Sequence, residues 1–139
     1  MAHAPFLTTS RLHLRPLTLD DVQVLHEAFS DPDTCRYTSS PPHVTEDETR
    51  ARVEKIMADT DCHEWAITEG AGEPALGTVG LYPSRDGIAG LGYMLHPEAC
   101  GRGIASEAVK AVLAHGFEVM YLRRIYADID PDNTASIRL

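Results

Sequence analysis

Lysine is almost missing from this chain: Lys55 and Lys110 are the two lysines, and every other basic residue is arginine. There are 12 basic residues against 21 acidic ones, so the formal net charge is −9. A chain this acidic lacks the basic surface that nucleic-acid binding requires, and we expect no nucleic-acid partner. Long apolar runs are also missing. None approaches the roughly 20 residues that span a bilayer, so we expect no membrane partner.

Cysteine pairs and metal-ligand motifs are missing too. The three cysteines (Cys35, Cys62 and Cys100) are odd in number and form no CxxC pair. The seven histidines include no HExxH motif and no spaced Cys/His quartet, so we expect no metal site. The N-terminus shows no basic segment followed by an apolar one. Together with unpaired cysteines, this predicts a cytoplasmic protein.

The chain's 139 residues suffice for one domain with a substantial core, and we treat residues 1–139 as a single domain. Alternating side chains and helix-capping residues predict three elements in its first half: a strand at 12–16, a helix at 18–31 and a surface helix at 45–59. Short runs joined by turns then predict an antiparallel meander of strands at 63–68, 75–82 and 91–96. Helical spacing predicts a long helix at 103–120, and a strand at 125–130 follows. The predicted fold class is α+β.

Two glycines lie where the third meander strand passes into the long helix, in the run Gly101-Arg102-Gly103. Without Cβ atoms the backbone can approach a ligand closely, and the first amides of a helix bind phosphate. A plain glycine turn remains an alternative. There is no P-loop motif, and a dinucleotide fingerprint would need glycine where Ser106 stands. A dinucleotide-binding oxidoreductase unit over Gly101–Asp130 therefore remains a second alternative.

The run from His96 to Ala108 resembles the acetyl-CoA signature of the GNAT N-acetyltransferases, and in particular the RimJ/RimL branch that acetylates ribosomal-protein N-termini. Residues 7–16 are similar to the opening strand of that branch, and residues 132–139 to its entry into the last helix. The resemblance implies a GNAT-like acyl-CoA N-acyltransferase fold, with a central, mostly antiparallel sheet flanked by helices. It also implies that the C-terminal elements (the rest of the last helix and the final strands) are missing after Leu139. We expect the strand edge left uncovered to favour a homodimer.

The resemblance also implies an activity: an acetyl group passes from acetyl-CoA to a primary amine by direct attack in a ternary complex. The acceptor would be a protein N-terminus or a small-molecule amine. The implied cofactor-binding residues are Met94, Leu95, His96, Gly101, Arg102, Gly103, Ile104, Ala105, Ser106 and Asn133. Cys100 departs from the family signature, which begins there with another residue type. A non-catalytic CoA-binding module is a further alternative.

Two residues are candidates for moving protons. Ser136 is the position that the resemblance implies for the acid that protonates the thiolate of CoA. Glu64, on the first meander strand, is the candidate general base; His63 and a water relay are alternatives. The competing interpretation of Glu64 is a solvated carboxylate on the face of a strand.

Overall fold

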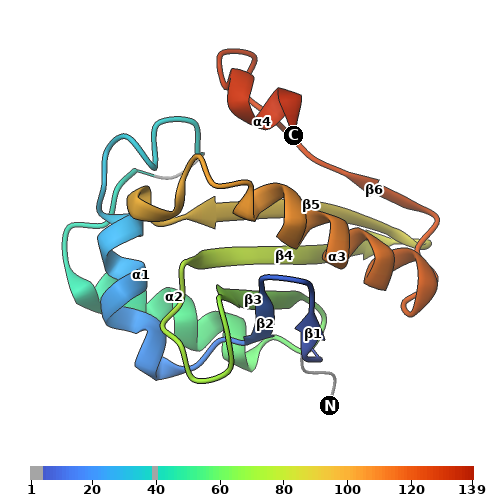
Figure 1. Cartoon of the computed structure of the whole chain (residues 1–139), viewed down its shortest axis with the longest axis horizontal. Helices are drawn as coiled ribbons and strands as arrows, with labels where there is room; N and C mark the ends of the chain where they lie inside the picture. Colours follow the sequence, from blue (N-terminus) through green and yellow to red (C-terminus); the bar gives the residue numbers. More distant parts are fainter. Residues whose placement is uncertain (1–4, 39–40) are drawn as a thin grey trace.

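The computed structural model describes residues 5–38 and 41–139 (Figure 1). Residues 1–4 and 39–40 lie outside the described residues, and with them part of the N-terminal segment discussed above. The strands are β1 (Leu7–Thr8), β2 (His13–Pro16), β3 (His63–Thr68), β4 (Gly77–Arg85), β5 (Ile88–Leu95) and β6 (Arg124–Tyr126). The α-helices are α1 (Val22–Phe29), α2 (Glu46–Ala58), α3 (Ile104–Glu118) and α4 (Thr134–Arg138), with short 3₁₀ turns at Leu19–Asp21 and Pro97–Ala99.

The six strands form one sheet in the order β1-β2-β3-β4-β5-β6. Every neighbouring pair is antiparallel except β5 and β6, which run parallel. The α+β class and the mostly antiparallel sheet are therefore confirmed. A doubly wound parallel sheet, which the dinucleotide-binding alternative needs, is not what the described residues form.

Strand β5 is shared between β4 and β6 over only part of its length. It pairs with β6 through Ile88–Gly90, whereas its pairing with β4 continues to Leu95. From Leu91 onward its other edge has no strand partner among the described residues. Figure 1 shows β6 leaving β5 in the direction of α4. The two parallel strands therefore diverge in the shape of a V. The unpaired edge of β5, from Leu91 onward, faces the inside of this V.

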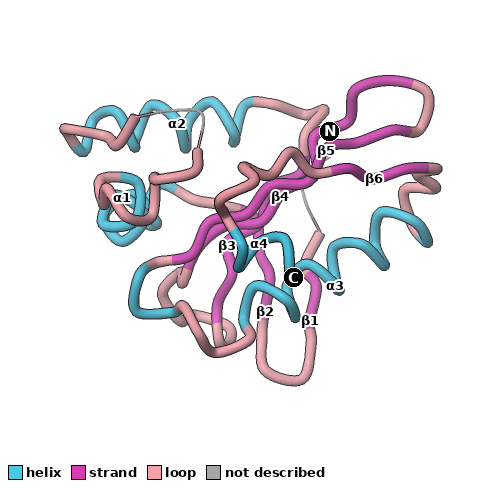
Figure 2. The backbone as a smooth tube through the Cα atoms, turned by 90° about the horizontal axis from the view of Figure 1, so that it is seen from above, coloured by secondary structure: helices cyan, strands magenta, loops and turns pink. Residues whose placement is uncertain are grey.

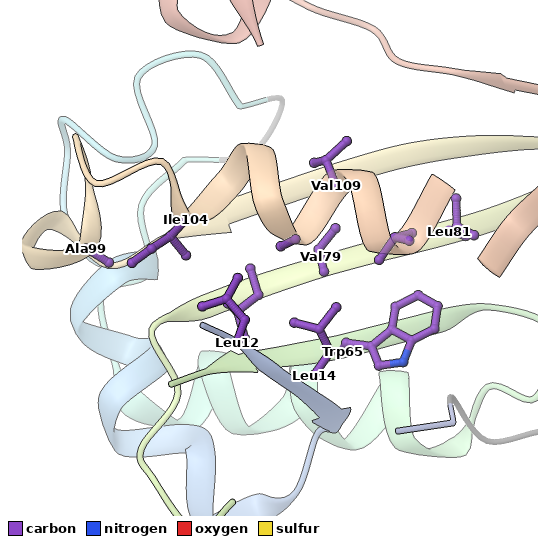
Figure 3. Close-up of a cluster of buried hydrophobic side chains, with 11 residues drawn as sticks. Leu12, Leu14, Trp65, Val79, Leu81, Ala99, Ile104 and Val109 are labelled. Carbon is purple, nitrogen blue, oxygen red and sulfur yellow. The ribbon is translucent and has the colours of Figure 1, made fainter. Parts of the chain in front are cut away.

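Helices cover both faces of the sheet (Figure 2). Helix α3 packs on one face over a cluster that includes Trp65, Val79 and Ile104 (Figure 3). Helices α1 and α2 pack on the other face, over a cluster that includes Val53 and Ala66. Trp65 and Ala66 belong to different clusters because successive side chains of a strand point to opposite faces. Helices thus cover the sheet on both faces.

Several strand boundaries differ from the sequence-based prediction. Strand β4 continues to Arg85, and β5 begins at Ile88 rather than at 91, because Arg85 pairs with Ile88. The connection is therefore the two-residue turn Asp86-Gly87, whose φ values of 49° and 77° are both positive. Asp-Gly is the sequence signal for this tight hairpin turn. Strand β6 stops at Tyr126 because its pairing with β5 ends there.

Candidate active site

The predicted anion site lies at the N-terminus of α3, where Gly101 and Gly103 have φ values of 78° and 74°. An L residue adopts this left-handed backbone only at a cost, so glycine is required at both positions. A Cβ added at Gly101 would meet nothing within 4 Å. One added at Gly103 would meet only Arg11 Nη2, at 3.3 Å. The loop therefore leaves an open approach to the end of the helix.

The backbone amides at this end of α3 have no partners inside the helix. The first helical hydrogen bond is donated by Glu107 N to the Gly103 carbonyl, at 3.2 Å. The N–H groups of Ile104, Ala105 and Ser106 precede it and are left without carbonyl acceptors. Ile104 and Ala105 bury their side chains in the core, which fixes the position of their amides. Three fixed donors at the positive end of a 15-residue helix are suited to a phosphate group.

Arg11 and Glu107 hold this loop in place, and sequence analysis did not single out either of them. Arg11 Nε lies 2.8 Å from Glu107 Oε1, and Arg11 Nη1 donates to the Arg102 carbonyl at 2.9 Å. Thr9 Oγ1 also donates to the Glu107 carboxylate. The Thr9 hydrogen bond first, and then those from Arg11, lower the pKa of Glu107 to about 2. These residues are more than 90 positions apart in the chain, so no local pattern could reveal the contact.

The Arg102 side chain is engaged by a partner of its own. Its guanidinium forms an ion pair with Glu69, in the connection between β3 and β4, and about half of its side chain is exposed. The neighbouring Cys100 is exposed, and its Sγ lies 3.7 Å from the His96 carbonyl. A bound phosphate would compete with Glu69 for Arg102.

The open edge of β5 leads from this loop into the V. His96 N donates to the Leu76 carbonyl at 2.7 Å, on the β4 side. Because backbone groups alternate between the two edges of a strand, Met94 also faces β4, whereas Leu95 and Tyr93 turn their amides toward the open edge. The His96 ring lies 3.3 Å from Glu27 of α1. Of the three residues at this end of β5 that the resemblance implies for cofactor binding, Leu95 is the one that presents its amide to the open edge.

Helix α4 brings Ser136 to the same edge. Asn133 caps this helix by accepting a hydrogen bond from Ser136 N at 3.2 Å. Asn133 and Ser136 are half-buried, and the other residues from 131 to 139 are exposed. Ser136 Oγ lies 2.6 Å from the Tyr93 hydroxyl of β5. The predicted acid therefore lies beside the strand whose amides face the V.

Glu64 is buried, with 3% of its surface exposed, so the interpretation as a solvated carboxylate is wrong. Tyr82, which sequence analysis missed, donates its hydroxyl to Glu64 Oε1, and Arg52 Nη2 lies 3.7 Å from that oxygen. Glu64 Oε2 is buried and has no partner among the described residues. Burial raises the pKa of Glu64, although Arg52 and Tyr82 act in the opposite direction.

The position of Glu64 keeps it apart from Ser136. Glu64 pairs with Gly80 of β4, which pairs in turn with Gly92 of β5, so two strand spacings separate it from the V. The Tyr82 ring covers this gap, because a Cβ on Gly80 would lie 2.6 Å from the Tyr82 hydroxyl. On the α2 side Glu64 lines a cavity of about 310 Å³, together with Arg52, Lys55, Ile56, Asp59, Asp61, Cys62, Tyr82 and Pro83.

His63, the alternative base, faces the opposite side of the sheet from Glu64. Its ring lies 5.9 Å from that of Trp65 and 6.2 Å from that of His115. Burial lowers the pKa of both histidines. In the part of the chain that the structure describes, no three His, Cys, Asp or Glu side chains gather as metal ligands. None of the helices in that part has the length and apolar character needed to cross a membrane.

The known proteins to which this chain is similar include acetyltransferases. The family model described as "Acetyltransferase (GNAT) domain" matches residues 11–139. The chain is 33% identical over 138 residues to "Uncharacterized N-acetyltransferase p20" of Bacillus licheniformis, a match that covers 96% of this chain and 78% of the relative. It is 26% identical over 129 residues to the spermidine N(1)-acetyltransferase of Escherichia coli K12, covering 91% of this chain and 68% of that protein.

Solved structures show the same fold. A GNAT-family acetyltransferase from Bacillus anthracis superposes with a TM-score of 0.87 at 29% identity, covering 96% of this chain and 79% of that one. The Vibrio cholerae spermidine N-acetyltransferase in complex with CoA and spermine gives 0.82 at 22% identity, covering 94% and 78%. A Vibrio cholerae protein assigned as a ribosomal-protein-serine acetyltransferase gives 0.81 at 20% identity, covering 99% and 81%. The last two likenesses concern the fold alone.

Proposed function

Because the chain belongs to the GNAT acetyltransferase family, whose members use acetyl-CoA, and is an N-acetyltransferase that acts on an amine, we propose where the reaction takes place. The diphosphate of acetyl-CoA binds the loop and helix end from Gly101 to Ser106. Its pantetheine arm lies along the open edge of β5. The observation that carries this proposal is the closeness of two unpaired surfaces along the chain: residues 96–103 alone separate the unpaired edge of β5 from the free amides of α3.

Each part of this surface has a task in acetyl transfer. The amides of Ile104, Ala105 and Ser106 bind phosphate oxygens. The edge amide of Leu95 pairs with the pantetheine as a neighbouring strand would. An amide at the Tyr93 end of the same edge stabilises the oxyanion that forms when the amine attacks the thioester carbonyl. Asn133 holds Ser136, which protonates the departing thiolate.

Glu64 is the proposed base. The attacking nitrogen must lose a proton, and a buried carboxylate with a raised pKa is a better proton acceptor than an ordinary one. Because Tyr82 lies between Glu64 and the V, the proton reaches the carboxylate through the Tyr82 hydroxyl or through a water molecule in the adjacent cavity.

The acceptor is proposed to be the N-terminal amine of a protein, as in the RimJ/RimL branch. Residues 7–16, 96–108 and 132–139 support this proposal by their resemblance to that branch, as does the fold shared with the ribosomal-protein-serine acetyltransferase. A polyamine is the second candidate, because a spermidine N(1)-acetyltransferase is among the relatives. The reaction is a direct attack within a ternary complex in either case.

The test has two steps. Thermal unfolding with acetyl-CoA or NAD at equal concentrations should show stabilisation by acetyl-CoA and none by NAD. Stabilisation by NAD alone would contradict the proposed cofactor. Steady-state transfer to a panel of peptides with free N-termini, spermidine, spermine and a small aromatic amine then identifies the acceptor. Tight binding of acetyl-CoA without transfer to any amine would leave only a CoA-binding role.

Three broader properties belong to the same proposal. Residues 1–139 form a single domain, the protein acts in the cytoplasm, and two copies associate through the outer edge of β6. Support for the association comes from that edge, which has no strand partner among the described residues, and from the exposed Tyr126 on it. Light scattering at two protein concentrations measures the association.

A further inference from the structure

The hydroxyls of Tyr93 in β5 and Ser136 in α4 are in contact. They lie 2.6 Å apart, and either oxygen can donate the hydrogen. Among the described residues, no other side chain makes a hydrogen bond with Ser136 Oγ. Building on the proposed function, we propose that Tyr93 is a positioning residue for acetyl transfer, which orients the Ser136 hydroxyl and replaces the proton that it gives to the thiolate.

Serine by itself is a poor acid for protonating a thiolate. An aliphatic hydroxyl is a far weaker acid than a thiol, so a serine that gave up its proton alone would be left as an unstable alkoxide. A phenol is a much stronger acid than an aliphatic alcohol and is closer to a thiol. A phenol within hydrogen-bond distance of Ser136 Oγ therefore supplies what serine lacks.

The fold places this phenol well for the task. The Tyr93 ring packs against the core cluster under α3, which limits its movement. Its backbone lies at the unpaired part of β5, beyond the last residue that pairs with β6. Ser136 is held from the other side by its backbone hydrogen bond to the capping Asn133. Both partners are thus fixed by contacts that do not depend on the hydrogen bond between them.

Two bonds change at the thioester carbon, and two protons move along the pair of hydroxyls. The amine nitrogen bonds to the thioester carbon, and the C–S bond then breaks with its electron pair passing to sulfur. The thiolate takes the proton of Ser136 Oγ, and Ser136 takes the proton of the Tyr93 hydroxyl in the same movement. The base removes the extra proton of the amine and releases it to water, and water returns one proton to the Tyr93 oxygen, so no proton is gained or lost overall. Nothing is oxidised or reduced.

The test uses the whole chain with saturating acetyl-CoA and the best acceptor of the panel. Tyr93→Phe keeps the ring and removes the hydroxyl, Ser136→Ala removes the other hydroxyl, and a third variant carries both changes. Tyr121→Phe is the matched control, because Tyr121 is 81% exposed in the connection between α3 and β6. We expect Tyr93→Phe to lower kcat about tenfold or more, with KM for acetyl-CoA changed less than twofold.

Two readouts separate a proton relay from simple packing. The double variant should be no slower than Ser136→Ala alone, because the relay is already broken there. Plotted against the fraction of D₂O, the rate of the wild type should curve, as expected for two protons in motion, and that of Tyr93→Phe should be linear. The control should match the wild type, with every variant folded by circular dichroism.

Other outcomes would contradict the role proposed for Tyr93. An active wild type whose kcat survives Tyr93→Phe overturns this inference and leaves the proposed function intact. So does a double variant whose losses multiply, or a rise in KM for acetyl-CoA with kcat unchanged, since these indicate that Tyr93 only supports the fold. A wild type that transfers acetyl to no amine removes both the proposed function and this inference.

Discussion

Replacing Glu64 by Gln should make the protein more stable and less active. The two side chains have nearly the same shape, and the amide oxygen of Gln can still accept the hydrogen bond from Tyr82. The change removes a negative charge from a site with 3% exposure, where one carboxylate oxygen has no partner among the described residues. A buried polar atom without a partner costs about 1–3 kcal/mol, and a charged one costs more. We expect a gain of about 1 kcal/mol in the free energy of unfolding, or about 3 °C in Tm.

The gain should depend on pH in a defined direction. Burial raises the pKa of Glu64 above its ordinary value of 4.5, so the folded state binds a proton that the unfolded state releases. The contribution of Glu64 to stability is therefore fully present below pH 4.5 and is lost as the pH rises through the pKa of the folded state. Glu64→Gln and the wild type should differ least near pH 4 and most near pH 8.

Urea unfolding at several pH values measures this difference in stability. Steady-state kinetics measures how much activity the variant loses. If Glu64 is the base, kcat should fall by about 100-fold. Glu73→Gln, on an exposed carboxylate between β3 and β4, is the control and should change neither quantity. A Gln variant that is less stable at pH 8 would show that the pair with Arg52 outweighs the burial cost. An unchanged kcat would remove Glu64 from the chemistry.

Three further changes test the binding surface and the pairing of β4 with β5 beside it. Gly103→Asp should abolish acetyl-CoA binding in calorimetry, because it puts a negative side chain at the phosphate site; Gly72→Asp, at another glycine with positive φ, is the control for backbone strain and should bind normally. Gly77→Ala should lower the free energy of unfolding by about 3 kcal/mol in urea, because its Cβ would lie 2.1 Å from the Met94 carbonyl oxygen; an unchanged stability would refute that register. Arg11→Ala should raise KM for acetyl-CoA about tenfold while kcat stays within twofold, and the opposite split would show that Arg11 acts in chemistry rather than in shaping the loop.

Local patterns in the sequence identified the elements that depend on near neighbours. The helical spacing between Gly103 and Met120 predicted α3. The Asp86-Gly87 turn also had a local signal, but the prediction placed a longer turn over it. The error shortened both flanking strands, although it did not change the order of the meander.

The environment of Glu64 could not be predicted from its neighbours. In the sequence it is a carboxylate beside an apolar run, a pattern that usually means a solvated position on a strand face. Its burial depends on Tyr82, which is 18 residues away, and on Arg52 of α2. The ring of Tyr82 can cover it only because glycines at Gly80 and Gly92 leave room.

The sequence by itself determined the class of fold, the order of the elements and the run of glycines that marks the helix end, because each depends on residues close together in the chain. Only the tertiary structure decided which groups meet. The contacts between Arg11 and Glu107, between Tyr82 and Glu64, and between Tyr93 and Ser136 join residues 96, 18 and 43 positions apart. Such contacts follow from the pairing of strands and the packing of helices, and no local pattern in the sequence contains them.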